Sequence, residues 1–237
     1  MRPHFRRFAR ADALCISVET PTFERDTSDL LRASQCVAYL FVEFEDQVRI
    51  ATAFWISKTF LFTAGHTLYH RNLTKPKRIR LIEPSSPVVE WQMLMDDKYM
   101  TVGCTVVENP YNVTNCETDV ALLYTGNFTW KQSIGLSRTL PPIGATVDII
   151  GYPGEFSKWS LSKREGLTDI VKGFETAKML LPEGKLTITR GTVQSTGTLI
   201  SYKISTVQGM SGSCVVYQGR AIGEQHFIRS QQADPIF

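Results

Sequence analysis

The sequence contains, in this order, a histidine, an aspartate and a serine in settings that suit nucleophilic acyl transfer. His66 comes after a strand-like segment, Asp119 stands immediately before an apolar run, and Ser211 lies in a glycine-rich turn. A serine hydroxyl becomes a good nucleophile when a histidine takes its proton, and a carboxylate can hold that histidine in one tautomer. The residue types and their order therefore predict a Ser-His-Asp site.

The turn that contains Ser211 has the composition of a site for a developing negative charge. Glycines on both sides of the serine let the backbone turn tightly, so the amides of Gly209 and Ser211 can point at one oxyanion. Taken singly, a turn serine or an aspartate before a strand is commonly a structural residue. The combination of all three residues in this order favours chemistry.

Short strands separated by turns must position these residues. Runs rich in β-branched and aromatic residues begin near Ser34, and long amphipathic helical periodicity is missing. The first series of predicted strands covers residues 37–44, 48–56, 59–63, 78–82, 103–107 and 120–124. The second series covers residues 146–150, 186–189, 191–194, 198–204, 213–217 and 221–227.

The strand pattern predicts an all-β protein built from two barrels. Two groups of six strands, separated by a turn-rich join over residues 137–144, favour two six-stranded antiparallel β-barrels over one sandwich. His66 and Asp119 then lie on the first barrel and Ser211 on the second, which places the site in the cleft between the barrels. We assign residues 1–33 to an N-terminal extension, 34–136 to the first barrel and 144–237 to the second.

The segments around the three residues resemble the motifs of the chymotrypsin-fold serine proteases. T-A-G-H resembles the histidine motif of that family, T-D-V-A-L-L its aspartate motif and G-M-S-G-S its nucleophile motif, in the same order. The closer resemblance is to the V8-like glutamyl endopeptidases, whose pattern Y-x-[LI]-S-T-x-x-G-x-S-G-S matches residues 202–213. Residues 151–154 read G-Y-P-G, which matches a second motif of that branch, and the likeness extends over residues 34–227.

The resemblance implies a serine endopeptidase that hydrolyses peptide bonds through an acyl-enzyme. By this resemblance, His66 of this chain would be the general base, Asp119 its orienting partner and Ser211 the nucleophile. The amides of Gly209 and Ser211 would form the oxyanion hole. The resemblance also implies a polypeptide substrate and neither a metal ion nor an organic cofactor, whereas the sequence predicts no oligomeric state.

The resemblance also points to residues of a substrate pocket. Thr206, five residues before Ser211, matches a position that holds the P1 side chain together with a histidine in a G-x-H strand. Here that strand reads I-G-E-Q-H, so alignment on its glycine selects Gln225, whereas counting from Ser211 selects His226. Side chains alternate between the two faces of a regular strand, so only one of Gln225 and His226 is expected to point into the pocket unless a bulge interrupts the strand. The implied preference is for Glu or Gln at P1.

Departures from the family pattern keep a second function open. Met210 replaces the aspartate that pairs with the freed N-terminus in trypsin-like zymogens, and the sequence ends ten residues after Phe227 without the family's C-terminal helix. The alternative function is a catalytically inactive protease homologue that serves as a protein-interaction module. An esterase is a further alternative, because the same acyl chemistry acts on esters.

Composition and charge argue against several other function classes. The 237 residues are 43% hydrophobic and 21% charged, as in ordinary globular proteins. The net charge of +3 gives no general reason to expect a nucleic acid or a membrane surface as partner. The longest apolar run, residues 36–42, is far shorter than the roughly 20 residues that cross a bilayer.

The histidines and cysteines do not follow a metal-site pattern. His66 and His70 are four residues apart, but Thr67 stands where a zinc metalloprotease motif needs glutamate. The five cysteines are scattered without a C-x-x-C pair, which favours reduced, mostly buried thiols over a disulfide framework. Cys104 and Cys116 could still form a bridge if a loop brought them together.

The sequence leaves the compartment of the protein open. The N-terminus lacks the apolar region of a secretory signal, and four arginines before Asp12 weakly resemble an organelle transit peptide. Three N-glycosylation sequons, which begin at Asn72, Asn112 and Asn127, matter only for a chain that enters the secretory pathway.

Overall fold

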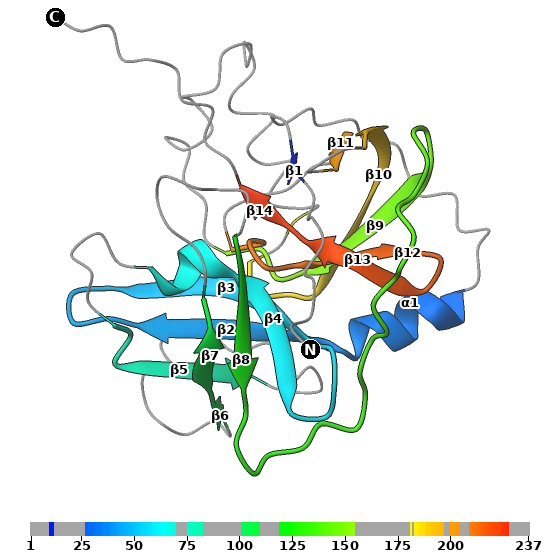
Figure 1. Ribbon diagram of the computed structural model, residues 1–237. Coiled ribbons are helices and arrows are strands. Elements are labelled where there is room, and N and C mark those ends of the chain that lie inside the picture. The colour runs from blue at the N-terminus through cyan, green and yellow to red at the C-terminus, as the bar shows by residue number, and fades with distance from the viewer. Residues whose placement is uncertain are drawn as a thin grey trace, which may run out of the picture.

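Strands dominate the structure, a computed structural model (Figure 1). It describes residues 10–11, 27–69, 75–82, 101–109, 119–154, 181, 183–196, 200–203 and 209–227. In chain order the elements are β1 (Arg10–Ala11), α1 (Thr27–Ser34), β2 (Val37–Glu43), β3 (Val48–Trp55), β4 (Phe60–Ala64), the 3-10 helix η1 (Gly65–Leu68), β5 (Arg78–Ile82), β6 (Thr101–Gly103), β7 (Thr105–Glu108), β8 (Val120–Tyr124), β9 (Thr146–Gly151), β10 (Thr187–Ser195), β11 (Ser201–Lys203), β12 (Cys214–Tyr217), β13 (Arg220–Glu224) and β14 (His226–Phe227).

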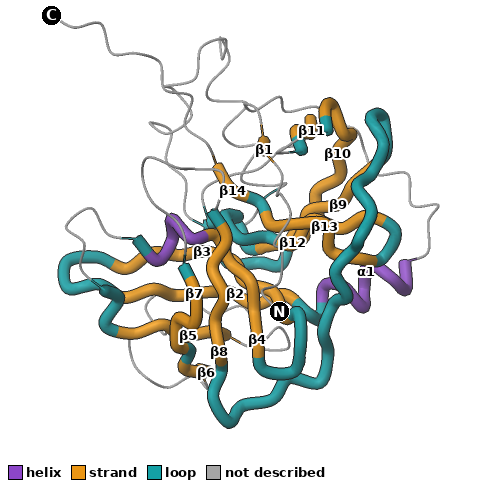
Figure 2. Tube along the Cα trace, viewed as in Figure 1, coloured by secondary structure: helices purple, strands orange, loops and turns teal. Residues whose placement is uncertain are grey.

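The strands build two sheets of seven strands each, which Figure 2 shows in orange. One sheet has the order β6-β5-β2-β3-β4-β8-β7 and the other has the order β13-β12-β9-β10-β11-β1-β14. In each sheet the two edge strands follow each other in the sequence. Cys104 alone separates β6 from β7, and Gln225 alone separates β13 from β14. The sheets therefore curve back on themselves, one into a nearly closed barrel and the other into a half-barrel. The predicted all-β, two-barrel fold is confirmed.

The longest apolar run of the sequence forms most of strand β2, which is buried on both faces. Its neighbours β3 and β5 pair with it on both sides, and both of its faces are covered. Leu40 and Val42 belong to the core of the first barrel, whereas Tyr39 and Phe41 belong to a cluster between the barrels. Because side chains alternate between the faces of a strand, a strand buried on both faces is apolar throughout.

The two barrels pack against each other through this second set of side chains, which we call the inter-barrel cluster. In the second barrel, Ile150 and Val216 face the cluster, whereas Ile149 and Val215 face the core of their own barrel. Full burial of one large apolar side chain contributes about 1.5–3 kcal/mol. The buried members of the cluster are Ala33, Cys36, Val37, Tyr39, Phe41, Phe54, Phe62, Ile82, Ile134, Ile150, Tyr152, Cys214, Val216 and Ala221.

Two predicted strands are each divided in the structure. The predicted strand 103–107 is interrupted at Cys104, which separates β6 from β7, and the predicted strand 221–227 is interrupted at Gln225, which separates β13 from β14. At both points the chain passes from one edge of its sheet to the other. Each predicted continuous strand is therefore two strands, joined by a one-residue corner that connects the two edges of the sheet.

Two other predicted strands, 186–189 and 191–194, form the single strand β10. Arg190 between them stays in the ladder opposite Asp148 of β9, and its Nε donates to the Asp148 carboxylate at 2.8 Å. Opposite charges placed directly across an antiparallel pair stabilise it, so the arginine does not interrupt the strand.

Parts of the N-terminal segment 1–33 pack against the barrels. Strand β1 pairs in parallel with β11 and β14 of the second sheet. Helix α1 ends beside the first barrel, where Ala33 is buried in the inter-barrel cluster and Leu30 packs against it. None of the helices in the described ranges is long and apolar enough to cross a membrane.

Candidate active site

The register of β4 and β8 brings His66 and Asp119 together. The two strands are antiparallel neighbours, and Ala64, the last residue of β4, lies opposite Val120, the first residue of β8. The residues after Ala64 and before Val120 therefore leave the sheet at the same end. The Gly65 amide donates to the Asp119 carbonyl at 3.0 Å, which extends the pairing by one step.

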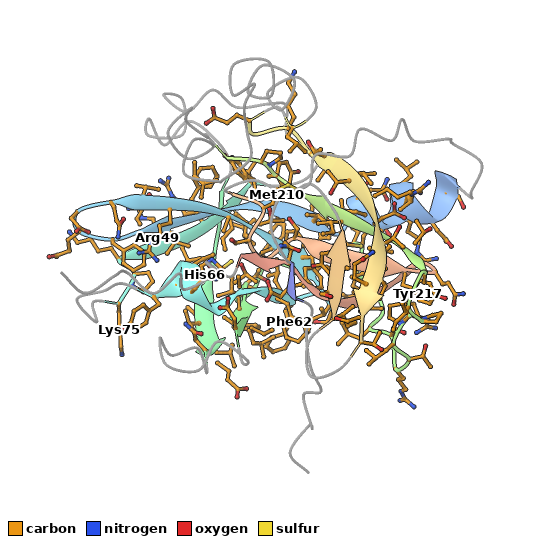
Figure 3. The ribbon with its side chains drawn as sticks, turned by 90° about the horizontal axis from the view of Figure 1, so that it is seen from above. Arg49, Phe62, His66, Lys75, Met210 and Tyr217 are labelled. Carbon is orange, nitrogen blue, oxygen red and sulfur yellow. The ribbon has the colours of Figure 1, made fainter. Side chains whose placement is uncertain are left out.

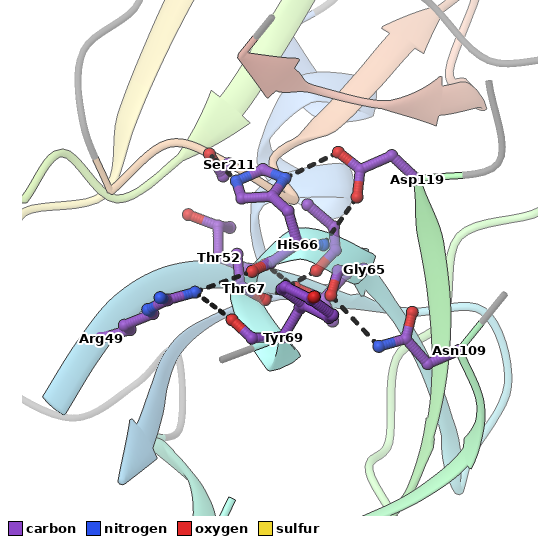
Figure 4. Close-up of polar contacts among 11 residues, drawn as sticks. Arg49, Thr52, Gly65, His66, Thr67, Tyr69, Asn109, Asp119 and Ser211 are labelled. Atoms are coloured by element: carbon purple, nitrogen blue, oxygen red, sulfur yellow. Dashed lines mark hydrogen bonds and ion pairs between the residues drawn. The ribbon is translucent and has the colours of Figure 1, made fainter. Parts of the chain in front are cut away.

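Asp119 holds His66 through both of its carboxylate oxygens (Figure 4). Oδ1 accepts from the main-chain amide of His66 at 2.7 Å, and Oδ2 lies 2.6 Å from the ring Nδ1. An ionised carboxylate only accepts hydrogen bonds, so Nδ1 carries the proton and Nε2 is left as an acceptor. Asp119 is 4% exposed and the side chain of His66 is 28% exposed. The orienting group is thus shielded from water while the imidazole is open to it.

Ser211 completes this series of contacts from the second barrel. Its Oγ lies 3.1 Å from His66 Nε2, within hydrogen-bond distance. Ser211 stands in the turn that leads into β12, and the Ser213 amide closes this turn by donating to the Met210 carbonyl at 3.0 Å. The structure therefore brings together the three residues that the sequence singled out for chemistry.

Met210 fills an apolar site next to the nucleophile. Its side chain is fully buried in the core of the second barrel. Figure 3 shows Met210 and His66 near the middle of the molecule, with Lys75 and Tyr217 towards opposite ends. An apolar side chain suits this buried position better than the aspartate of trypsin-like zymogens, which needs a charged partner. His70, the second histidine of the zinc spacing, lies outside the described residues.

Two glycines let the nucleophile turn approach other backbone segments closely. Gly209 and Gly212 have φ values of +90° and +82°. A Cβ on Gly212 would lie 2.1 Å from the Thr52 carbonyl oxygen, and a Cβ on Gly209 would lie 2.2 Å from the Gly154 nitrogen. Any side chain at either position would collide with backbone, so glycine is required there. The role of Gly209 and Ser211 as oxyanion donors stays a prediction.

Gln225 is the one predicted pocket residue whose side chain the structure describes. Its main-chain amide donates to the Ser213 carbonyl at 2.8 Å, and its carbonyl accepts from the Gly212 amide at 2.6 Å. These two bonds place Gln225 beside the nucleophile turn. His226 begins β14, but its side chain is outside the description, and Thr206 lies outside the described residues.

Tyr202 fixes the side chain of Gln225 from within the second barrel. Its hydroxyl donates to Gln225 Oε1, and both side chains are buried. Burial and, to a smaller degree, the charge of Glu224 raise the pKa of Tyr202 well above its usual value of 10.0. Tyr202 therefore stays a neutral donor, and the amide oxygen of Gln225 is turned towards it. Sequence reasoning matched Tyr202 to a family pattern but assigned it no role.

The cysteines in the described part of the chain do not compete with Ser211 as nucleophiles. Cys36, Cys104 and Cys214 are free thiols. Burial raises the pKa of Cys36 from 9.0 to about 11, and it raises the pKa of Cys214 well above 9.0. Such thiols are not ionised at neutral pH, and the thiolate is the reactive form. Cys116, the suggested bridging partner of Cys104, lies outside the described residues.

Two polar side chains that the sequence did not single out fix the main chain around His66 (Figure 4). Arg49 Nη1 donates to the carbonyls of His66 and Tyr69 at 2.9 and 2.5 Å. Asn109 Nδ2 donates to the Gly65 carbonyl at 3.2 Å. The His66 carbonyl also accepts from the Tyr69 amide at 3.3 Å, so Arg49 adds a second donor to a carbonyl that is already bonded at the end of the short helix. The signal for Arg49 in the sequence is an arginine inside an otherwise apolar strand, which does not identify its partner.

Comparisons with known proteins bear on the fold. No family model matches the sequence, and no curated protein matches it significantly. Among solved structures, the active form of the Rv3671c protease from M. tuberculosis matches with a TM-score of 0.53 and 14% identity, over 83% of this chain and 72% of that chain. The serine endoprotease from Yersinia pestis matches with a TM-score of 0.53 and 19% identity, over 85% of this chain and 58% of that chain.

A third solved structure, the HtrA-type protease AlgW with a tripeptide, matches with a TM-score of 0.52 and 17% identity, over 83% of this chain and 52% of that chain. This chain therefore spans little more than half of the second and third structures. The matches do not test the V8-like branch, which stays a prediction. At these identities the likeness shows the fold, and the chain has the two-barrel fold of the chymotrypsin-like serine proteases.

Proposed function

We propose that this protein is a serine endopeptidase that hydrolyses polypeptides with a triad of His66, Asp119 and Ser211. The observation that carries the proposal is the unbroken series of contacts among the three side chains. Asp119 Oδ2 lies 2.6 Å from His66 Nδ1, and His66 Nε2 lies 3.1 Å from Ser211 Oγ. A carboxylate, a base and a hydroxyl in this order form the arrangement that activates serine for acyl transfer.

In the first half-reaction, Ser211 Oγ attacks the carbonyl carbon of the scissile peptide bond, and its proton passes to His66 Nε2. The carbonyl electrons move onto the oxygen, where the amides of Gly209 and Ser211 stabilise the negative charge. Asp119 stays ionised and stabilises the imidazolium. When the carbonyl re-forms, the carbon–nitrogen bond breaks and the leaving amine takes the proton from Nε2.

In the second half-reaction, water attacks the ester carbonyl of the acyl-enzyme while His66 Nε2 takes one proton from it. Collapse of the tetrahedral intermediate breaks the bond to Ser211 Oγ, which receives the proton back, and releases a carboxylic acid product. The His66 side chain is 28% exposed, so part of the imidazole is open to water. Every proton transfer in the cycle passes through His66 Nε2.

We further propose that the pocket prefers Glu or Gln at P1, as in the V8-like branch that the sequence resembles. Gln225 lies beside the nucleophile turn, and its amide oxygen is bonded to Tyr202. A side-chain amide carries an NH₂ group that donates hydrogen bonds, which is the chemistry that a carboxylate or amide oxygen on a P1 side chain requires. Because the strand is interrupted at Gln225, between β13 and β14, regular alternation of faces does not exclude His226, and Thr206 and His226 complete the pocket in this proposal.

Cleavage of an unfolded polypeptide tests both parts of the proposal. Wild-type protein, Ser211→Ala and Ser137→Ala are incubated with a reduced and alkylated protein, and the new termini are identified by mass spectrometry. Ser137 is a half-buried serine in the segment between the barrels, its hydroxyl bonds to the Thr139 carbonyl, and it serves as the matched control. We expect cuts after Glu and Gln by the wild type and Ser137→Ala, and a rate lower by about 10⁶-fold for Ser211→Ala.

The outcomes separate the parts of the proposal. Equal cleavage by Ser211→Ala would contradict the triad. Cleavage that depends on Ser211 but shows no enrichment of Glu or Gln would contradict only the pocket. A folded wild type that cuts nothing favours the inactive homologue that acts as an interaction module.

A further inference from the structure

Thr52 joins the nucleophile turn to the first barrel. It lies in β3 and is fully buried. Its main-chain amide donates to the Ser211 carbonyl at 2.9 Å, and its hydroxyl donates to the Gly209 carbonyl at 3.2 Å. A single residue of the first barrel thus binds both ends of the tripeptide 209–211.

The hydroxyl of Thr52 also connects this tripeptide to the G-Y-P-G segment. The Tyr152 amide donates to Thr52 Oγ1 at 3.0 Å, so the hydroxyl uses its proton for Gly209 and a lone pair for Tyr152. Gly209 packs closely against Gly154, because a Cβ on Gly209 would lie 2.2 Å from the Gly154 nitrogen. The G-Y-P-G motif therefore packs against the nucleophile turn, and the hydroxyl of Thr52 bonds to both segments.

Hydrogen bonds to three successive carbonyls fix the peptide groups of the nucleophile turn. Thr52 binds the carbonyls of Gly209 and Ser211, and the Met210 carbonyl accepts from the Ser213 amide at 3.0 Å. A peptide group is planar, so a carbonyl that is held in place also fixes the amide of the next residue. The Met210 bond thus orients the Ser211 amide, and Thr52 prevents rotation of the peptide groups on either side.

Gly209 is the position in this turn that most needs such a bond. Glycine has no side chain to restrict its dihedral angles, and the φ of +90° at Gly209 is one that glycine adopts without resistance. Its main-chain conformation therefore depends on hydrogen bonds, and the hydroxyl of Thr52 supplies the one to its carbonyl.

We propose that Thr52 is a positioning residue for the oxyanion site, because its hydroxyl fixes the 209–210 peptide group, which lies between the two proposed donor amides of Gly209 and Ser211 and sets their relative orientation. The inference rests on the proposed serine hydrolase chemistry and assigns a part of it to a residue that does not touch the substrate. The bond from the Thr52 amide to Ser211 survives any substitution except proline, so a side-chain variant isolates the contribution of the hydroxyl.

The test compares Thr52→Val, Thr52→Ala and Thr52→Ser with the wild type. Valine keeps the shape of threonine but removes the hydroxyl, alanine removes it without adding a methyl group, and serine keeps it. Thr125→Val is the matched control, because Thr125 is also buried and its hydroxyl bonds to the carbonyls of Thr59 and Phe128 in the first barrel. Thermal unfolding establishes that each variant is folded.

The readout is the second-order rate constant for phosphonylation of Ser211 by a fluorophosphonate, whose phosphoryl oxygen occupies the oxyanion site. We expect this constant to fall by about 10- to 100-fold in Thr52→Val and Thr52→Ala, less than the loss of a whole oxyanion donor. Thr52→Ser and Thr125→Val should stay within about threefold of the wild type, because their turns keep the bond to Gly209. With a cleavable peptide, the same loss should fall on kcat and not on KM.

Each result decides a different point. A folded Thr52→Val that reacts at the wild-type rate, or a Thr52→Ser that is as slow as Thr52→Val, would overturn the role of the hydroxyl. If Thr52→Val and Thr52→Ala both fail to fold while Thr125→Val folds, Thr52 is a structural residue and the inference is also overturned. A folded wild type that forms no adduct contradicts the proposed function itself.

Discussion

The two oxygens of Asp119 have different partners on His66, and this difference sets the state of the base. Oδ1 receives the main-chain amide of His66, which fixes the carboxylate, and Oδ2 then faces the ring Nδ1. Because Oδ2 can only accept, Nδ1 keeps its proton and Nε2 accepts from Ser211. The negative charge also stabilises the imidazolium that forms when Ser211 loses its proton.

Replacing this carboxylate by an amide should reverse the tautomer of His66. In Asp119→Asn, the remaining oxygen binds the main-chain amide and the NH₂ group faces Nδ1, so Nε2 carries the proton and cannot take one from Ser211. We expect kcat to fall by about 10⁴-fold with little change in KM. Asp148→Asn, which removes a carboxylate that pairs with Arg190 on the second barrel, is the control for steady-state kinetics. A loss of less than about tenfold in Asp119→Asn would contradict this assignment.

The sequence predicts the three residues of the proposed triad but not the residues that fix the main chain around them. His66, Asp119 and Ser211 each stand in a motif whose residue types are required by the reaction. Thr52 and Arg49 bind main-chain carbonyls, and any residue has a carbonyl. Their partners therefore leave no residue-type pattern in the sequence, and only the folded structure reveals them.

At the scale of elements, strand ends and one tight turn create the site. The ladder between β4 and β8 ends at the pair Ala64 and Val120, so His66 and Asp119 emerge side by side. The turn before β12 carries Ser211 from the other barrel to within reach of His66. Each of these placements follows from main-chain pairing, before any side chain of the site makes a contact.

Gly212 should be among the least replaceable residues of the turn. In Gly212→Ala, the new Cβ would lie 2.1 Å from the Thr52 carbonyl oxygen, and alanine would have to adopt a φ of +82°. Gly126 also has a positive φ, +63°, but a Cβ there would meet nothing within 4 Å. We expect Gly126→Ala to lower the free energy of unfolding by about 1–2 kcal/mol and Gly212→Ala by about 2–5 kcal/mol.

Urea unfolding of the two alanine variants measures this difference. The cost of a positive φ is common to both, so the excess in Gly212→Ala reports the collision with β3. Equal losses of stability in the two variants would show that the nucleophile turn has room to move away from the first barrel.

The sequence predicts most strands because their β-branched and aromatic runs are separated by turn residues. It does not reveal the corners at Cys104 and Gln225, because neither residue is a glycine or a proline that would mark a break. It also divides β10 at Arg190, because a charge inside a strand looks like an end until its partner Asp148 is known. Helix α1 is too short to show a helical period. The assigned barrel boundaries, residues 34–136 and 144–237, stay a prediction.

At the scale of the whole molecule, the active site depends on how the two barrels sit against each other. His66 and Asp119 come from one barrel and Ser211 from the other, and the inter-barrel cluster contains buried side chains of both barrels. Cys36 and Cys214 are buried in this cluster, one from each barrel. Their burial makes the stability of the assembly depend on pH in the alkaline range.

The free energy of unfolding should decrease as the pH rises above 9. The pKa of Cys36 is raised from 9.0 to about 11, and the pKa of Cys214 is also raised, so the folded protein keeps protons that the unfolded chain loses. This contribution to stability is fully present below pH 9 and is lost as the pH rises towards the folded pKa, at about 1.4 kcal/mol per pH unit for each thiol.

Urea unfolding between pH 7 and 10.5 tests this prediction. Cys36→Ala lowers the stability at every pH because it leaves a cavity, but it should also reduce the alkaline slope by the share of one thiol. An unchanged slope in Cys36→Ala would show that its thiol does not titrate differently in the folded and unfolded states.

Intact-mass labelling with a fluorophosphonate tests the central claim most directly. The reagent reacts only where a nucleophile, a base and an oxyanion site are assembled together. We expect one adduct on the wild type, located at Ser211 by peptide mapping, an equal adduct on Ser137→Ala, and no adduct on Ser211→Ala or His66→Ala. A folded wild type without an adduct, or an adduct that persists in His66→Ala at the wild-type rate, would contradict the account of Ser211 as a nucleophile activated by His66.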